Sequence, residues 1–266
     1  MVHNSPPRHI KTWLENSTGH IQFNRPESRN AISAQMWRDI PQLIENFDKN
    51  DQVRTIVLSG AGNECFSAGA DISEFSTNRT QSNAARQYEA LNVAAFTAIA
   101  NTSKPTIASI AGYCMGGGLA IALSCDLRIA AENAIFCLPP AKLGLAYPLE
   151  GIRQLLGVIS PPVAKEMIFT GRTFNALDAS RSGLVNEVTT LDQLQDTVEA
   201  LCKTIAQNAP LTIAASKQTI DELHHHPENP DMEKLTALSD QCFASSDYLE
   251  GQKAFAEKRK PVFQGK

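Results

Sequence analysis

Two stretches rich in small residues carry the clearest chemical signal in this sequence. The first is Phe66–Ile72, and the second is Gly112–Ala120, which contains three consecutive glycines. Small side chains let a ligand approach the backbone closely, and a helix start presents unpaired N–H groups with partial positive charge. Two helix starts that face one point would form an oxyanion hole from backbone donors alone. The alternative is that these glycines only permit tight packing of helix against strand.

Several common catalytic motifs are absent from the sequence. The second stretch lacks the G-x-G-x-x-G spacing of dinucleotide-binding proteins, and no Gly-Lys-Ser/Thr follows it. No Gly-x-Ser-x-Gly motif occurs, so a serine hydrolase has no nucleophile motif. The triplet His224–His226 precedes two prolines. Adjacent helical residues point in different directions, so we predict a solvated turn there and no metal site.

The elements that must position the two stretches alternate between strand and helix. Apolar patterning predicts strands at 11–15, 20–23, 53–58, 106–110 and 127–130, and helices at 33–48, 80–100 and 116–124. This alternation predicts parallel pairing in an α/β core. After about residue 191 only helices are predicted, at 191–206, 211–224, 231–245 and 248–260. We therefore expect an α/β region over residues 1–200 and a helical region over 201–266.

Composition narrows the class of protein. The 266 residues include 24 basic and 28 acidic ones, and the resulting charge of −4 argues against nucleic acid as the main partner. No run of about 18 apolar residues could span a membrane. The six cysteines form no C-x-x-C pair, which favours buried free thiols in a reducing compartment. The first ten residues lack a signal-peptide core, so we expect a soluble, cytoplasmic protein.

An ordered set of motifs resembles the enoyl-CoA hydratase/isomerase family, the crotonase superfamily, from about residue 10 to 263. Each motif alone is weak, but the ordered set is highly specific. The matching segments are 24–26 with 30–31, 66–72, 111–118, 124–128, 143–145, 170–172, 176–185, and 250–251 with 254–260.

The resemblance implies a fold, a ligand and an assembly. The fold would be a crotonase-like β-β-α superhelical core with a C-terminal helical trimerisation region, assembled as a homotrimer or hexamer. The ligand would be an acyl-CoA, with coenzyme A as part of the substrate and no separate cofactor. The matching positions for the two oxyanion-hole N–H groups are Ala70 and Gly117. The positions that would hold coenzyme A are Ser28, Arg29, Ala31, Ala68 and Ile72, with Phe255 and Lys258 reaching it, often from a neighbouring subunit.

The sequence departs from the family where hydration needs proton transfer. The two glutamates of the family's hydratases are replaced by Ala120 and Pro140, and a third place that carries a carboxylate in some relatives is Pro148. None of these can move a proton. The nearest acid is Glu150, and we consider Glu150 and Tyr147 as proton-transfer candidates. For Glu150 the alternative is favourable pairing with a helix start.

Several readings of the function remain open from these residues. The favoured one is an enzyme that stabilises a thioester enolate, with isomerase-like chemistry preferred over two-glutamate hydration. The alternatives are a non-catalytic acyl-CoA-binding protein, a hydratase with a substitute carboxylate, and a thioester hydrolase or lyase that uses Glu150 and water. Glu74 and Glu89 are reserve bases. Asp126 and Arg128 are expected to form a structural ion pair, and Tyr113 to pack within its loop.

Overall fold

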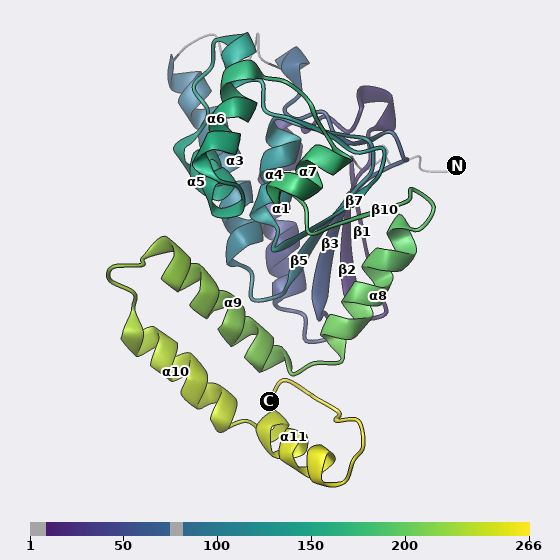
Figure 1. The fold of residues 1–266 in the computed structure, drawn as a ribbon, viewed down its shortest axis with the longest axis vertical. Coiled ribbons are helices and arrows are strands. Elements are labelled where there is room, and N and C mark those ends of the chain that lie inside the picture. Colours follow the sequence, from purple (N-terminus) through teal and green to yellow (C-terminus); the bar gives the residue numbers. More distant parts are fainter. Residues whose placement is uncertain (1–8, 75–81) are drawn as a thin grey trace, which may run out of the picture.

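The chain builds two sheets, as the computed structural model shows for residues 9–74 and 82–266 (Figure 1). The six-stranded sheet has the order β1-β2-β3-β5-β7-β10. Its strands are β1 (Ile10–Glu15), β2 (Thr18–Phe23), β3 (Thr55–Gly60), β5 (Thr106–Ile110), β7 (Leu127–Ala131) and β10 (Glu187–Thr189). Only β1 and β2 pair antiparallel; the other neighbours are parallel, as predicted. Asn16 and Ser17 both have positive φ angles, which suits the tight turn between β1 and β2.

The second sheet was not predicted from the sequence. It has the order β4-β6-β8-β9, with strands β4 (Cys65–Ser67), β6 (Tyr113–Met115), β8 (Ile135–Cys137) and β9 (Phe174–Asn175). None is longer than three residues, too short for alternating hydrophobicity to be recognised. The pairs β3/β4, β5/β6 and β7/β8 each place one strand in each sheet. This repeated turn is the β-β-α superhelix expected from the resemblance.

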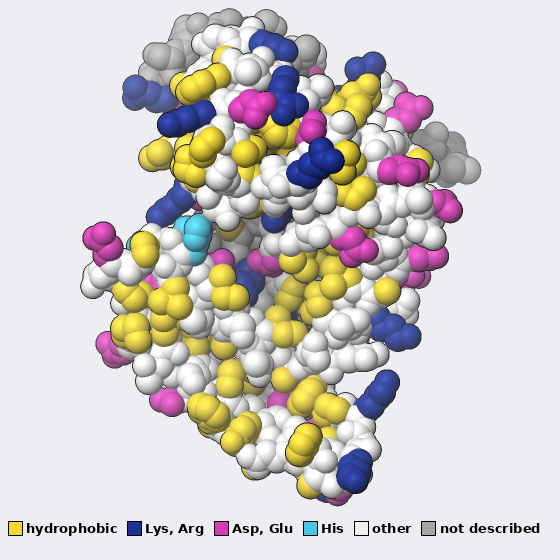
Figure 2. Space-filling view, viewed as in Figure 1, with side chains coloured by type: hydrophobic (Ala, Val, Ile, Leu, Met, Phe, Trp, Pro, Cys, Tyr) yellow, Lys and Arg dark blue, Asp and Glu magenta, His cyan; other side chains and the backbone are white. Residues whose placement is uncertain are grey.

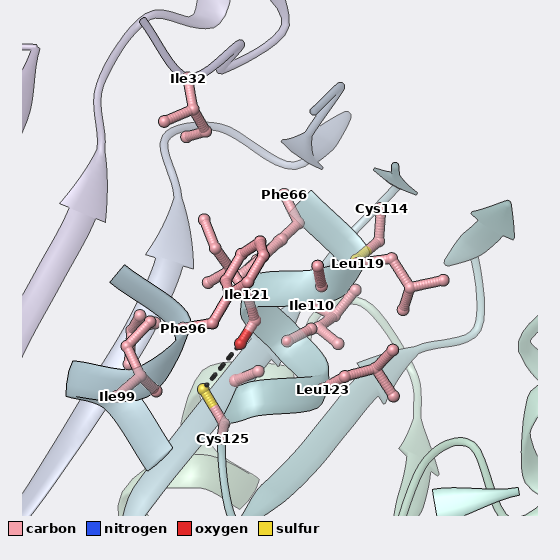
Figure 3. Close-up of a cluster of buried hydrophobic side chains, with 14 of the residues drawn as sticks. Ile32, Phe66, Phe96, Ile99, Ile110, Cys114, Leu119, Ile121, Leu123 and Cys125 are labelled. Carbon is pink, nitrogen blue, oxygen red and sulfur yellow. Dashed lines mark hydrogen bonds between the residues drawn. The ribbon is translucent and has the colours of Figure 1, made fainter. Parts of the chain in front are cut away.

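The helices of the core lie on both sides of the six-stranded sheet or pack on other helices. They are α1 (Ala34–Asp48), α3 (Ser82–Asn101), α4 (Gly117–Ser124), α5 (Leu149–Val158), α6 (Pro161–Thr170), α7 (Ala176–Ser182) and α8 (Leu194–Ala206). Along β3, Ile56 and Leu58 belong to the larger apolar cluster, whereas Val57 belongs to a smaller one beneath α8. Figure 3 shows part of the larger cluster, where Phe96 and Ile99 of α3 lie beside Ile121 of α4.

Three further helices form a C-terminal arm, which we define as residues 210–266. These are α9 (Pro210–His225), α10 (Met232–Phe243) and α11 (Ser246–Ala256). The arm extends away from the sheets (Figure 1). The division expected between residues 200 and 201 falls inside α8, and Cys202 of α8 is buried against the sheet. Packing therefore favours a division between α8 and α9.

One predicted contact is wrong. Asp126 and Arg128 do not form an ion pair, because each has another partner. The carboxylate of Asp126 accepts from Lys217 Nζ at 2.9 Å. The buried guanidinium of Arg128 instead donates to the carbonyl oxygens of Leu184 and Cys125, at 2.9 and 2.7 Å.

The cysteines agree with the sequence expectation: all six are free, and five of them are buried. The histidine triplet is exposed as expected, but His224 and His225 are the last residues of α9 and do not form a turn. Within residues 9–74 and 82–266, no cluster of histidine, cysteine or acidic side chains that could hold a metal ion is found. A search of the same residues finds no helix with the length and apolar character needed to cross a membrane.

Candidate functional site

The two small-residue stretches bring the N–H groups of Ala70 and Gly117 together. A Cβ atom placed on Gly117 would lie 3.4 Å from the Ala70 nitrogen, and one placed on Gly69 would lie 3.1 Å from the Gly117 nitrogen. Within the described parts of the chain, neither N–H donates to a backbone carbonyl. Gly117 is the first residue of α4, so its N–H has no acceptor inside the helix. Two adjacent donors are therefore left for an anionic oxygen.

Glycine conformations and one ion pair position these donors. Gly69 and Gly116 have positive φ angles of 94° and 49°, which L side chains rarely adopt. The backbone at Ile32 pairs with the segment 69–71. The Ile32 N–H donates to the Gly69 carbonyl, and the Asp71 N–H donates to the Ile32 carbonyl. The Asp71 carboxylate accepts from Arg25 Nη1 at 2.8 Å, and both side chains are mostly buried. These contacts anchor the segment on either side of Ala70.

The proposed coenzyme-binding residues from the first half of the chain are adjacent in the fold. Ala68 N–H donates to the Arg29 carbonyl at 2.9 Å, and the Ala31 carbonyl accepts from Arg25 Nη1 at 2.9 Å. Ser28 ends the short 3-10 helix that leads into Arg29. The side chain of Ile72 lies outside the part of the chain that the structure describes.

A shallow pocket opens beside these residues. Arg29, Asn63 and Tyr113 are among the residues that line it. The sequence suggested that Tyr113 packs within its loop. In the structure it is 42% exposed, so it does not pack fully there. Its side chain is available to a ligand that lies along this surface.

The two proposed coenzyme-binding residues near the C-terminus lie elsewhere. Phe255 and Lys258 belong to α11 and the turn after it, at the far end of the C-terminal arm from α4 (Figure 1). Phe255 is 88% exposed. A single chain therefore does not bring them to the Ala70–Gly117 pair, and any contact with the same ligand requires another copy of the chain.

The buried aromatic side chain of Trp37 lies beside Gly117, a position that was not recognised from the sequence. A Cβ on Gly117 would lie 3.1 Å from Cζ2 of the fully buried Trp37 of α1. Trp37 Nε1 donates to Tyr88 OH at 3.0 Å, and the Trp37 ring meets the edge of Phe96 with centroids 5.6 Å apart. Trp37 follows the apolar periodicity of α1, so the sequence marks it as a core residue but not as a neighbour of Gly117.

The proton-transfer candidate Glu150 faces the C-terminal arm. It lies in the first turn of α5, one-third exposed, with Oε2 4.0 Å from Arg153 Nη1. Burial and the charges of Arg153 and His224 lower the pKa of His225, and the charges of Asp221 and Glu150 oppose this effect. The charge of Glu150 therefore acts on His225, at the end of α9.

The second candidate, Tyr147, is placed differently. Its hydroxyl is buried and has no hydrogen-bond partner within the described residues. Burial raises the pKa of Tyr147, and the nearby Cys114 adds to this effect. Cys114 lies three residues before Gly117. A tyrosine with a raised pKa stays protonated, so it can donate a proton or a hydrogen bond but is a poor base.

The remaining acids are occupied or directed outward. Glu74 Oε2 accepts from Ala34 N–H at 2.7 Å, at the start of α1, and Glu89 is exposed on α3. Ala120 and Pro140, which replace the expected glutamates, are both buried and apolar. Glu150 and Tyr147 therefore remain the first candidates for proton transfer among the described residues.

Comparison with known proteins matches nearly the whole chain. A family model described as enoyl-CoA hydratase/isomerase matches residues 14–266. The chain is 32% identical over 246 residues to a short-chain-enoyl-CoA hydratase of Clostridium acetobutylicum, covering 92% of this chain and 94% of that protein. It is 33% identical over 254 residues to carnitinyl-CoA dehydratase of Escherichia coli, with the same shares covered.

Solved structures agree with these sequence matches. An enoyl-CoA hydratase/isomerase family protein from Hyphomonas neptunium superposes with a TM-score of 0.92 at 35% identity, covering 96% of this chain and 97% of that one. An enoyl-CoA hydratase/carnitine racemase from Magnetospirillum magneticum has a TM-score of 0.91 at 32% identity, covering 98% and 97%.

Proposed function

This chain belongs to the enoyl-CoA hydratase/isomerase family, and on that premise we propose that it transforms an acyl-CoA thioester through an enolate held by the N–H groups of Ala70 and Gly117. The observation that carries this proposal is the adjacency of these two donors, neither of which is used by a backbone carbonyl of the described residues. Removing a proton beside the thioester carbonyl moves negative charge onto its oxygen. Donors that are already in place stabilise that charge without reorganising.

The proposed reaction is isomerase-like. A base takes a proton from C2 of a 3-enoyl thioester, and the electrons of that C–H bond move through the carbonyl onto the thioester oxygen to give a dienolate. When the electrons return, C4 takes up the proton and the double bond lies between C2 and C3, which gives the 2-enoyl thioester; the reverse reaction takes the proton from C4 and returns it to C2. This route needs one proton-transfer group and no bound water, which suits a site with Ala120 and Pro140 at the two glutamate positions. Glu150 is the candidate base, and protonated Tyr147 is the candidate hydrogen-bond or proton donor.

A product analysis tests this proposal. The protein is incubated with 2-enoyl-CoA, 3-enoyl-CoA and 3-hydroxyacyl-CoA thioesters of several lengths, and products are identified by mass spectrometry. We expect interconversion of 2-enoyl and 3-enoyl thioesters, with hydration of crotonyl-CoA orders of magnitude slower. Hydration at a turnover typical of enzymes, about 10 per second, would contradict the proposal and would require a substitute carboxylate.

Two isosteric variants separate the proton-transfer candidates. Glu150→Gln keeps the shape and removes the base, while Tyr147→Phe removes only the hydroxyl. Loss of a general acid or base lowers the rate by about 100- to 10,000-fold. The variant that shows such a loss identifies the group. If both retain full turnover, neither residue transfers the proton.

A second candidate function is acyl-CoA binding without turnover. It is favoured by one observation, the replacement of both expected glutamates by residues that cannot transfer protons. It predicts that acyl-CoA raises the melting temperature, as any native-state ligand does, while every thioester in the panel stays unchanged.

A further inference from the structure

The start of α1 is joined at two points to the segment that carries Ala70. Just before the helix, the backbone of Ile32 pairs with the backbone of Ala70. At the first helical residue, the Ala34 N–H donates to Glu74 Oε2 at 2.7 Å. Ile32 and Glu74 thus connect α1 to the chain at and after Ala70, so the first proposed donor has a fixed place relative to this helix.

The second proposed donor contacts the same helix through Trp37, which lies in the first turn of α1. A Cβ atom placed on Gly117 would lie 3.1 Å from Cζ2 and 3.3 Å from Cη2 of the Trp37 ring. The same atom would lie 3.4 Å from the Ala70 nitrogen. The Gly117 backbone is therefore packed between the edge of the indole and the backbone of Ala70, and the indole prevents it from moving toward α1.

The Trp37 ring is itself held in one orientation by α3. Its Nε1–H donates to the buried hydroxyl of Tyr88 at 3.0 Å, and the ring meets Phe96 edge to face, with centroids 5.6 Å apart. In an indole, Nε1 and Cζ2 are bonded to the same carbon atom. The hydrogen bond to Tyr88 therefore fixes the part of the ring that meets Gly117.

Building on the proposed function, we infer that Trp37 is a positioning residue that sets the Gly117 N–H relative to the Ala70 N–H. One rigid helix contacts both donors, Ala70 through the start of α1 and Gly117 through the indole. Such donors stabilise the oxyanion only when they are aimed at the place where its charge develops, and a misplacement of about 1 Å can lower the rate about 100-fold. Tyr88 contributes by keeping the indole in its orientation.

Infrared spectroscopy of a bound thioester tests this inference without requiring turnover. The probe is butyryl-CoA with ¹³C at the thioester carbonyl, which cannot isomerise because its acyl chain has no double bond. Hydrogen bonds to the carbonyl oxygen lower its stretching frequency, so the band of the wild-type complex should lie below that of butyryl-CoA in water.

Two variants should weaken this effect by different amounts. In Trp37→Phe the bound band should move part of the way back toward its position in water. The kcat of this variant for the best thioester should fall about 10- to 100-fold, with KM nearly unchanged, because the lost alignment matters most in the transition state. Tyr88→Phe, which keeps the indole but removes its acceptor, should show a smaller change in the same direction.

Two controls set the limits of the measurement. Gly117→Pro removes the donor itself and should move the band furthest. Ile44→Ala removes buried side-chain atoms from α1, about 10 Å along the helix from Trp37. It should lower the melting temperature and leave the band where the wild type has it.

The outcomes separate this inference from the proposed function. If Trp37→Phe and Tyr88→Phe both keep the wild-type band, the inference is overturned and the proposed function stands. A band that moves as far in Ile44→Ala as in Trp37→Phe also overturns it, because general loosening of the core would then explain the shift. If Trp37→Phe does not fold, Tyr88→Phe alone decides. If the wild type and Gly117→Pro share one band position, Gly117 does not bind the thioester oxygen, and the proposed function itself fails.

Discussion

The α/β core and the C-terminal arm contain helices of similar length but are stabilised in different ways. The core buries large side chains completely, Trp37, Phe66 and Phe136 among them. The arm buries only two apolar side chains, Leu235 and Ala254, and α9 has no buried residue. Figure 2 shows hydrophobic side chains gathered over the arm. Those more than 60% exposed are Ile220, Phe243, Leu249, Phe255 and Val262.

Polar contacts hold the arm in shape. The carboxylate of Asp247 accepts from the N–H groups of Gln264 and Gly265, at 2.7 and 2.8 Å. Glu250 binds Arg259 through two hydrogen bonds. The core is therefore complete within one chain, whereas the arm is folded but leaves an apolar face open. We propose that further copies of the chain cover this face, in a trimer or hexamer.

The largest effect should come from a change that disturbs the core without touching the proposed ligand. Gly112 has a φ of 63°, and a Cβ there would lie 1.9 Å from the Glu64 carbonyl oxygen. Strain and overpacking together should cost Gly112→Ala more than about 3 kcal/mol of unfolding free energy. Gly62→Ala is the control, because its φ is also positive but nothing lies within 4 Å; it should lose about 1–2 kcal/mol. Equal losses in urea unfolding would show that close packing does not distinguish the two positions.

The next effect concerns activity rather than stability. Gly117→Pro removes one proposed donor, while proline is well accepted at the first position of a helix. Turnover of the best thioester should fall by about 100- to 1,000-fold. Gly117→Ala retains the N–H and should lose less, although its Cβ would lie 3.1 Å from Trp37 Cζ2 and 3.4 Å from the Ala70 nitrogen. A Gly117→Pro protein that folds and keeps its full rate would remove Gly117 from the mechanism.

A change on the arm should affect assembly and leave the core intact. Phe243→Ser removes a ring that is 61% exposed in the single chain. Sedimentation velocity at micromolar concentration should show a trimer or hexamer for the wild type and smaller species for the variant. Leu149→Ser, at an 85% exposed position on α5, should leave assembly unchanged. A wild type that sediments as a monomer would contradict the proposed oligomer.

The smallest effect is a pH dependence within the arm. The hydrogen bonds from Arg259, and then from Val262 N–H, lower the pKa of Glu250 from 4.5 to about 2. Because the folded-state pKa lies below the unfolded value, this contact stabilises the fold above pH 4.5 and its contribution is lost as pH falls toward 2. Solvent exposure keeps the effect small. The free energy of unfolding in urea should change less between pH 5 and pH 3 in Arg259→Gln than in the wild type. An equal change in the two proteins would refute this contribution.

The fold was predictable where apolar periodicity is long. The spacing of Met36, Ile40 and Ile44 predicts α1, and all four C-terminal helices are present within a few residues of their expected ends. The three-residue strands of the second sheet give too short a pattern. Their pairing depends on neighbours far along the chain, such as Cys65 beside Tyr113.

The candidate site likewise has parts that could be predicted from the sequence and parts that could not. Ala70 and Gly117 were named from the family resemblance of the two glycine-containing stretches, and the structure brings the backbone of these stretches together. The surroundings of Glu150 and Gly117 could not be predicted, because they depend on elements far away in the sequence. The charge of Glu150 acts on His225 at the end of α9, and the hydrogen bond that ties Trp37, the neighbour of Gly117, to α3 joins Trp37 and Tyr88, 51 residues apart.

The position of Trp37 gives the protein an intrinsic optical reporter. The chain has two tryptophans: Trp37 is fully buried against Gly117, and Trp13 is 39% exposed and stacked on His20. In Trp13→Phe, Trp37 would be the one remaining tryptophan, so it alone would give the tryptophan fluorescence. Its emission depends on the polarity of its surroundings, so a thioester that enters beside Gly117 changes the signal. Occupancy of the acyl side of the site can thus be followed by fluorescence in real time, without a labelled substrate.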